Sequence, residues 1–171
     1  MKIVVMKFGG TSVATVKKIN NVAKIISKNY KKNKIVVVLS AMSGVTNQLQ
    51  SYIDEIDYFP SEETDLVMTS GEQVTVGLLS MILNKQGIKS KPLLGWQVPI
   101  ITDENHEKAR ILNIENKTMQ HYFKSHDVIV LAGFQGISLS GHITSLGRGG
   151  SDTTAVAIAS SLSAERCDIF T

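Results

Sequence analysis

Cysteine is almost absent from this chain of 171 residues, in which Cys167 is the one thiol. A single cysteine excludes a disulfide framework within the chain and is typical of a reducing compartment, so we predict a cytoplasmic protein. The N-terminal segment has only a short apolar run, interrupted by Lys7, and does not resemble a signal peptide. We expect no stretch of membrane-spanning length and predict no membrane partner.

Metal-ligand spacing and a charge excess are lacking too. The four histidines do not have the spacing of a metal site, and neither they nor the cysteine lie in a loop typical of a nucleophile, so we predict no metal held by the protein. The net charge is only +3, from 18 Lys and Arg against 15 Asp and Glu. Lysines scattered along residues 17–34 indicate a solvated helix face rather than a phosphate-tracking stripe, and no nucleic-acid partner is predicted.

What the sequence does contain is an alternation of short apolar strands with longer helical patterns. Its length and its 43% hydrophobic residues suit one well-buried domain. Continuous apolar strands alternating with helices indicate a parallel sheet covered on both faces, and hence one α/β domain. The predicted strands are residues 2–6, 34–40, 90–96, 98–102, 127–134 and 167–170.

The helices are predicted from apolar residues at helical spacing. Ser12 is placed to cap the first helix, and Gly87 is placed to end the second. Residues 136–146 contain Ser and Gly turns around short alternating pieces, which predicts a hairpin. The predicted helices are residues 13–26, residues 64–86, one or two helices between 106 and 124, and residues 152–163.

In open α/β sheets, ligands bind beyond the carboxyl ends of the strands, so the residues that follow strands are the candidates. The first such segment is KFGGTS, residues 7–12. Gly9 and Gly10 would let the backbone approach an anion, which Lys7 and a nearby helix N-terminus would attract. A surface lysine before an ordinary Gly-Gly turn explains the same residues equally well.

The second segment is LSAMSGVTNQL, residues 39–49, after the second predicted strand. Ser40 and Thr46 could donate hydrogen bonds to a carboxylate or a phosphate. Ser43 and Asn47 are better explained by helix capping and turn formation.

The third segment is SLGRGGSDTTAVAIA, residues 145–159. Its glycines indicate close backbone approach, and Arg148 would project from the loop that they form. The alternative is an exposed arginine followed by an ordinary helix cap at Ser151 or Asp152.

Glu72 stands just ahead of an almost uncharged apolar helix, in the stretch MTSGEQV. It is either a first-turn acid that favours the helix dipole or a partner for a substrate ammonium group. The preceding Ser-Gly pair indicates an element boundary or a kink. A site made of Lys, Arg, glycine amides, hydroxyls and two acids suits phosphoryl transfer, where positioning and charge neutralisation supply most of the catalysis.

Seven motifs, in order along the chain, resemble the catalytic domain of the aspartate kinases, which are members of the amino acid kinase family. They are KFGGTSV, LSAMSGVTN, TSGEQV, GWQVPIITD, KARI, VLAGFQG and LGRGGSDTTAVAIA. The resemblance implies an amino acid kinase-like (carbamate kinase-like) three-layer α/β/α fold with a mainly parallel sheet. Within it, residues 1–171 would be the N-terminal, aspartate-binding lobe.

The activity implied is ATP-dependent phosphorylation of the β-carboxylate of L-aspartate to 4-phospho-L-aspartate, with Mg²⁺ bound through ATP. This is the first step towards lysine, by way of diaminopimelate, and towards methionine and threonine. At the phosphoryl end, the resemblance implies that Lys7 contacts the transferring group and that Gly9 and Gly10 supply amides. Asp152 would organise the charged groups around the reacting atoms.

At the substrate end, the resemblance implies that Arg148 holds the α-carboxylate of L-aspartate and that Glu72 meets its amino group. Ser40 and Thr46 would be further contacts. The chemistry agrees, because a carboxylate with a reference pKa of about 4 is already ionised at pH 7 and needs no general base. Arg148 could also grip a carboxylate with two parallel hydrogen bonds, which a lysine cannot do.

Family members continue beyond this segment into an ATP-binding half, and most carry regulatory ACT domains after it. We expect both to be absent from this chain, which would then be a fragment or split subunit that is inactive alone. Such a lobe could form a homo-oligomer or associate with a missing C-terminal half. The alternatives are a non-catalytic aspartate-binding remnant and a related amino acid kinase that acts on another small acid, such as glutamate.

Overall fold

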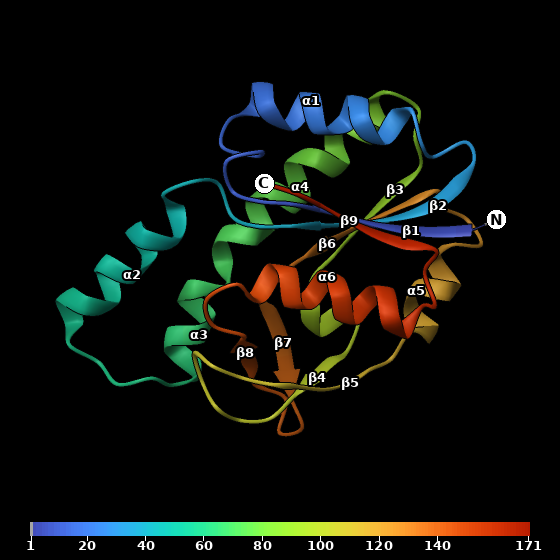
Figure 1. Cartoon of the computed structure of the whole chain (residues 1–171). Helices are drawn as coiled ribbons and strands as arrows, with labels where there is room; N and C mark the ends of the chain where they lie inside the picture. Colours follow the sequence, from blue (N-terminus) through green and yellow to red (C-terminus); the bar gives the residue numbers. More distant parts are fainter. Residues whose placement is uncertain (1) are drawn as a thin grey trace.

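A central five-stranded parallel sheet forms the middle layer of the computed structural model, which describes residues 2–171 (Figure 1). The strands lie in the order β3-β6-β2-β1-β9, and every neighbouring pair is parallel. The predicted parallel sheet is therefore confirmed. Its strands are β1 (Lys2–Phe8), β2 (Asn33–Leu39), β3 (Ser90–Leu93), β6 (Val128–Ala132) and β9 (Arg166–Phe170).

Helices cover both faces of this sheet, which gives the three-layer α/β/α architecture (Figure 1). On one face, side chains of β1 and β2 pack against α1 and α4, and on the other they pack against α5 and α6. Burial on both faces explains why β2 and β6 are continuous apolar runs. The four helices are α1 (Val16–Ser27), α4 (Ser70–Lys85), α5 (Lys117–Tyr122) and α6 (Gly150–Ser161).

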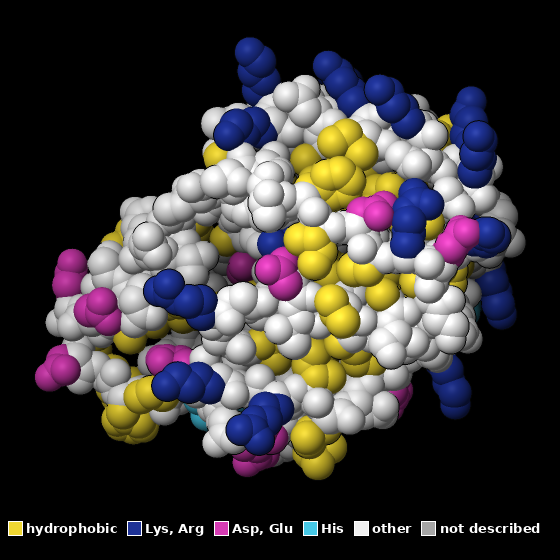
Figure 2. All heavy atoms as spheres, viewed as in Figure 1, with side chains coloured by type: hydrophobic (Ala, Val, Ile, Leu, Met, Phe, Trp, Pro, Cys, Tyr) yellow, Lys and Arg dark blue, Asp and Glu magenta, His cyan; other side chains and the backbone are white. Residues whose placement is uncertain are grey.

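The lysines of α1 lie on its solvent side, as the sequence predicts. Ile19, Val22, Ala23 and Ile26 of α1 are buried against the sheet. Figure 2 shows Lys and Arg side chains standing out over α1, away from the helix α2 (Val45–Ile56) and the acidic side chains gathered there.

A second, four-stranded sheet lies below the first, in the order β5-β4-β7-β8 (Figure 1). Its strands β7 and β8 form the predicted hairpin, in antiparallel register. The segment expected to be helical between residues 106 and 124 is only partly so, because β5 pairs with β4 there and leaves only α5 as a helix. Pairing with a distant strand overrides the local helical pattern. The elements are η1 (Gly95–Gln97), β4 (Ile100–Thr102), β5 (Ile111–Ile114), β7 (Gln135–Ser138) and β8 (Ile143–Ser145).

The long helix predicted for residues 64–86 is two helices, α3 (Glu62–Met68) and α4, with a break at Thr69. The break confirms the boundary indicated by the Ser-Gly pair, and Gly87, with a φ of 78°, follows the end of α4 as expected. The expectation that no stretch reaches membrane-spanning length was wrong. By length and composition alone, Glu62–Lys85 is long and apolar enough to cross a membrane. Half of its most apolar part is buried inside the domain, as in the core helix of a globular protein.

Glycine or threonine, rather than the expected residues, occupies three helix N-cap positions. Thr15, not Ser12, caps α1, and its hydroxyl accepts a hydrogen bond from the Lys18 amide. The caps of α2 and α6 are Gly44 and Gly149, both with left-handed backbone. Ser43, Ser151 and Asp152 are therefore not N-caps.

Candidate active site

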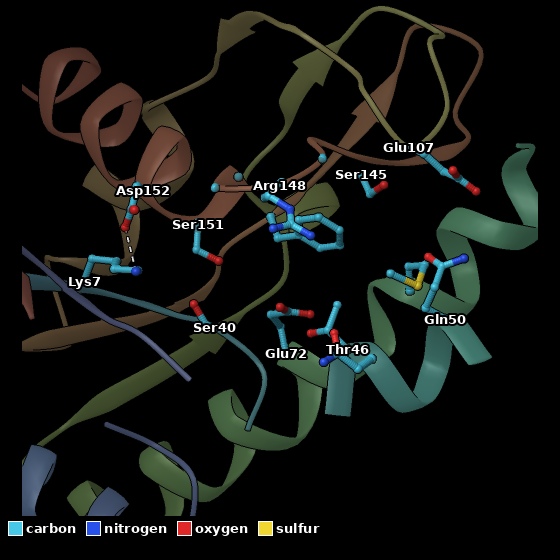
Figure 3. Close-up of a pocket in the computed structure, with 16 residues that line it drawn as sticks. Lys7, Ser40, Thr46, Gln50, Glu72, Glu107, Ser145, Arg148, Ser151 and Asp152 are labelled. Atoms are coloured by element: carbon cyan, nitrogen blue, oxygen red, sulfur yellow. Dashed lines mark ion pairs between the residues drawn. The ribbon is translucent and has the colours of Figure 1, made fainter. Parts of the chain in front are cut away.

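All six side chains predicted for the site line one open cavity of about 620 Å³ at the carboxyl ends of the central strands (Figure 3). They come from β1, the β2–α2 loop, α2, α4, the β8–α6 loop and α6, so the fold gathers residues from the whole chain. The position agrees with the rule that ligands bind beyond the carboxyl ends of parallel strands. The six are Lys7, Ser40, Thr46, Glu72, Arg148 and Asp152.

Lys7 and Asp152 form an ion pair at one end of the cavity (Figure 3). The Nζ of Lys7 lies 2.6 Å from Oδ1 of Asp152, and the Lys7 side chain is only 9% exposed. This oxygen is buried and has no hydrogen-bond partner among residues 2–171, so its contact with Lys7 is an ion pair. Asp152 therefore serves to balance a nearly buried cation rather than to cap α6.

Glu72 is almost fully buried in the first turn of α4. Its Oε1 accepts a hydrogen bond from the Ala41 amide at 3.0 Å, whereas Oε2 has no hydrogen-bond partner among residues 2–171. Burial, only partly offset by this backbone hydrogen bond, raises the pKa of Glu72 from 4.5 to about 7. A buried carboxylate with an unpartnered oxygen in a cavity is suited to receive a cation.

The β2–α2 loop is held against α4 at the same point. A Cβ added to Gly71 would lie 2.8 Å from the Cβ of Ala41, so only glycine allows this approach. The hydroxyl of Thr75 donates a hydrogen bond to the carbonyl of Ser40 at 2.9 Å. These contacts fix the loop that carries Ser40 beside Glu72.

Arg148 lies at the tip of the β8–α6 loop, between two glycines of left-handed backbone, Gly147 and Gly149. A Cβ on Gly147 would lie 2.9 Å from the carbonyl oxygen of Glu107, which confirms that the glycine-rich loop makes a close backbone approach. Arg148 is exposed and forms no ion pair with any carboxylate of residues 2–171. Its guanidinium is thus available for an anionic ligand.

Gly9 and Gly10 do not line the cavity. The Gly9 amide donates its hydrogen bond to the Phe170 carbonyl, and Gly10 lies against the Ala41 carbonyl, 2.9 Å from where its Cβ would be. The expected helix N-terminus is also further away, since α1 begins at Val16. The phosphate-binding role of these glycines stays a prediction.

Sequence reasoning missed several residues that line the cavity, chief among them Phe134, Ser145 and Ser151. Phe134 has a φ of 71°, which is rare for a bulky residue and marks a constrained position. The hydroxyl of Thr154 accepts the hydrogen bond of the Phe134 amide at 3.1 Å and helps to hold it there. Phe134 ends the strand motif VLAGF, so its position after a strand was the available signal.

The arrangement can receive a small zwitterion beside a phosphoryl group. Arg148 offers two parallel donors to a carboxylate, and Glu72 offers a carboxylate to an ammonium group. Lys7 supplies a cation at the other end of the cavity, where negative charge would need neutralising. Among residues 2–171, no three His, Cys, Asp or Glu side chains are grouped to hold a metal ion. Fold and site together define an α/β domain whose pocket suits phosphoryl transfer to a small amino acid.

Comparison with known proteins agrees with this class. The model of the amino acid kinase family matches residues 2–171. An aspartokinase of Geobacillus stearothermophilus is 46% identical over the whole of this chain and 42% of its own length, and the aspartate kinase Ask_LysC of Stutzerimonas stutzeri is 49% identical over the same shares. The chain therefore belongs to the amino acid kinase family, and it spans less than half the length of these aspartokinases.

Solved structures show the same likeness. The crystal structure of Escherichia coli aspartokinase III in complex with aspartate and ADP superposes with a TM-score of 0.87 at 26% identity, over 99% of this chain and 49% of that one. The aspartate kinase from Synechocystis gives a TM-score of 0.81 at 41% identity, over 98% of this chain and 28% of that one. Uridylate kinase from Archaeoglobus fulgidus, at 19% identity and a TM-score of 0.65, shares the fold alone.

Proposed function

We propose that the chain is the aspartate-binding part of an aspartate kinase, which transfers the γ-phosphoryl group of ATP to the β-carboxylate of L-aspartate. The observation that carries the proposal is that Glu72 and Arg148 line the same cavity, and that neither the Oε2 of Glu72 nor the guanidinium of Arg148 has a charged partner among residues 2–171. The two groups match the ammonium and α-carboxylate of an amino acid. The names of the sequence relatives supply the particular substrate.

In this proposal, Arg148 and Glu72 orient L-aspartate so that its β-carboxylate faces Lys7. The β-carboxylate is already ionised, so an oxygen attacks the γ-phosphorus directly while the bond to the ADP oxygen breaks. Lys7 neutralises negative charge on the transferring group, and Asp152 holds Lys7 in place until that group arrives. Ser40 and Thr46 supply further hydrogen bonds to the substrate.

The described cavity offers little positive charge to ATP. Lys7 and Arg148 are the cations among the residues that line it, and Lys7 is already paired with Asp152. One paired lysine is too little charge for the triphosphate of ATP. We therefore propose that the remaining nucleotide contacts come from outside residues 2–171, and that Mg²⁺ is carried by ATP. The chain would then be the N-terminal lobe of the kinase domain, with negligible turnover by itself.

Isothermal titration calorimetry of this chain tests the substrate assignment. L-aspartate should bind with one site per chain, and succinate, which lacks the ammonium group that meets Glu72, should bind at least about tenfold more weakly. L-glutamate is the matched control for a different small acid. Tighter binding of L-glutamate would move the proposal to another amino acid kinase, and no binding of either would overturn it.

Trapping with hydroxylamine tests the reaction. The complete gene product, given L-aspartate and Mg·ATP, should form an acyl phosphate that hydroxylamine converts to the hydroxamate. Aspartate binding without hydroxamate would favour a non-catalytic aspartate-binding protein. Hydroxamate formation by the 171-residue chain alone would disprove the need for further nucleotide contacts.

A further inference from the structure

Asp65 is a carboxylate of α3 with no exposed surface. Its Oδ1 accepts hydrogen bonds from the Ser145 hydroxyl at 2.5 Å and from the Glu107 amide at 3.0 Å. Its Oδ2 lies 2.8 Å from Nδ1 of His106. An isolated buried carboxylate would be costly, so these three partners hold Asp65 and are held by it.

The partners of Asp65 come from the two segments that support the Arg148 loop. Ser145 is the last residue of β8 and precedes that loop. Glu107 carries the carbonyl oxygen against which Gly147 lies. The Ala109 amide donates to the Ser145 carbonyl at 2.9 Å and joins the two segments to each other.

On its other side, Asp65 belongs to the helical wall that carries Glu72. The helix α3 leads through Thr69 directly into α4, where Glu72 lies in the first turn. Met68 of α3 itself lines the cavity. Asp65 is therefore a buried contact between the ammonium side of the cavity and its carboxylate side.

No ion pair within residues 2–171 holds the guanidinium of Arg148, so its position depends on the backbone of its loop, which Asp65 helps to hold through Ser145 and Glu107. A shift of about 1 Å in such a group can cost up to about a hundredfold in activity.

We propose that Asp65 is a positioning residue that sets the separation between Arg148 and Glu72, and so places the two groups to hold the carboxylate and the ammonium group of one ligand. The proposal rests on the proposed function for the identity of that ligand, but the anchoring of the loop by Asp65 does not. Asp65 touches no substrate, since it has no exposed surface and does not line the cavity. It acts through Ser145 and Glu107.

The test compares Asp65→Asn with Glu62→Gln. Asparagine keeps the size of the side chain but removes its negative charge, and its NH₂ group can face His106 only if the imidazole changes tautomer, so the loop should be held less firmly. Glu62 is the matched control, because it lies on the same helix and pairs with His142 of the β7–β8 hairpin at 3.0 Å, with both side chains about half exposed. Hydrogen exchange of residues 145–150 and calorimetric titration with L-aspartate are the two measurements.

Asp65→Asn should accelerate exchange of residues 145–150, leave β1 and β2 protected, and weaken L-aspartate binding about tenfold or more. In the complete gene product, the KM for L-aspartate should rise while the KM for ATP stays unchanged. Glu62→Gln should change neither measurement. A uniform rise in exchange, or unchanged binding in a folded Asp65→Asn protein, would overturn the proposal.

If Asp65→Asn does not fold, the hydrogen exchange of Ser145→Ala decides the matter, because Ser145 itself lines the cavity and its loss can affect binding directly. Ser145→Ala removes one hydrogen-bond partner from Asp65 and leaves the other two, so the same changes should appear with smaller size, about threefold in affinity. Unchanged exchange of residues 145–150 in Ser145→Ala would overturn the proposal. Failure of the unaltered protein to bind L-aspartate would instead overturn the proposed function, and the hydrogen exchange of residues 145–150 would still decide whether Asp65 anchors the loop.

Discussion

The Nζ of Lys7 lies 2.6 Å from Oδ1 of Asp152, although the two residues come from opposite ends of the chain. Strand β1 packs beside α6, and this packing brings the lysine at the strand's carboxyl end to the first turn of the helix. Each charge neutralises the other in the free protein. An incoming phosphoryl group would compete with Asp152 for the lysine, so the pair can hold Lys7 ready without blocking it.

Asp152→Asn should therefore impair phosphoryl transfer without impairing the binding of L-aspartate. The change leaves the nearly buried Lys7 without its counter-charge, and we expect a loss of about 1 kcal/mol of stability, modest because Asp152 is half exposed. Turnover by the complete gene product should fall about a hundredfold, while L-aspartate affinity changes less than about threefold. Thermal unfolding, steady-state kinetics and calorimetry measure the three effects. An affinity loss as large as the loss of turnover would place Asp152 at the substrate end instead.

Arg148→Ala should weaken L-aspartate binding by about thirtyfold or more, because a charge-assisted pair of hydrogen bonds is lost. Arg148→Lys keeps the charge but not the planar fork, and should recover only part of the affinity. Arg110→Ala is the control, since Arg110 is also an exposed arginine but lies outside the cavity. Equal affinities for Arg148→Ala and the unaltered protein, measured by calorimetry, would exclude the carboxylate clamp.

Glu72 should make L-aspartate binding depend on pH. Because its pKa is about 7, Glu72 is mostly protonated at pH 6 and mostly ionised at pH 8, and only the ionised form pairs with an ammonium group. Affinity should therefore rise between pH 6 and pH 8. In Glu72→Gln, affinity should be low and nearly independent of pH. Glu55→Gln, an exposed change on α2, should keep the original profile.

The buried carboxyl group of Glu72 should make the folded protein less stable towards unfolding as the pH rises. Its pKa is higher in the folded protein than the usual 4.5, so the folded state binds more protons between pH 4.5 and about 7, and stability falls across that window. The shift corresponds to on the order of 3 kcal/mol. Glu72→Gln should consequently be more stable than the unaltered protein at pH 8 but not at pH 4, as measured by urea unfolding at both values. Equal stability of the two proteins at pH 8 would contradict the raised pKa.

Gly147→Ala should displace the Arg148 loop. Its φ of 75° disfavours a side chain, and the new Cβ would also lie 2.9 Å from the Glu107 carbonyl oxygen. We expect a loss of about 1–2 kcal/mol of stability and about tenfold weaker L-aspartate binding. Gly141→Ala is the matched control, with a φ of 88° and no atom within 4 Å of its Cβ. Gly141→Ala should lose part of the stability that Gly147→Ala loses and should leave L-aspartate binding unchanged. If the two substitutions weaken binding equally, the contact between Gly147 and the Glu107 carbonyl is not the cause.

Much of the fold and of the site could be read from local sequence. The strands β1, β2 and β6 are buried on both faces, so each is a continuous apolar run that needs no partner to be recognised. The polar residues that follow such strands converge at one edge of a parallel sheet, which is why the six predicted side chains meet in one cavity. Sequence by itself thus determined the parallel α/β architecture and which six side chains to look for at the carboxyl ends of its strands.

Only the tertiary structure decided how those residues act on one another. Residues 111–114 became a strand because β4 lies beside them, and Asp152 paired with Lys7 because α6 packs beside β1. Burial raised the pKa of Glu72, and three hydrogen-bond partners from other segments gathered around Asp65. Strand partners, desolvation and long-range hydrogen bonds are set by residues distant in the chain, and a local pattern carries no record of them.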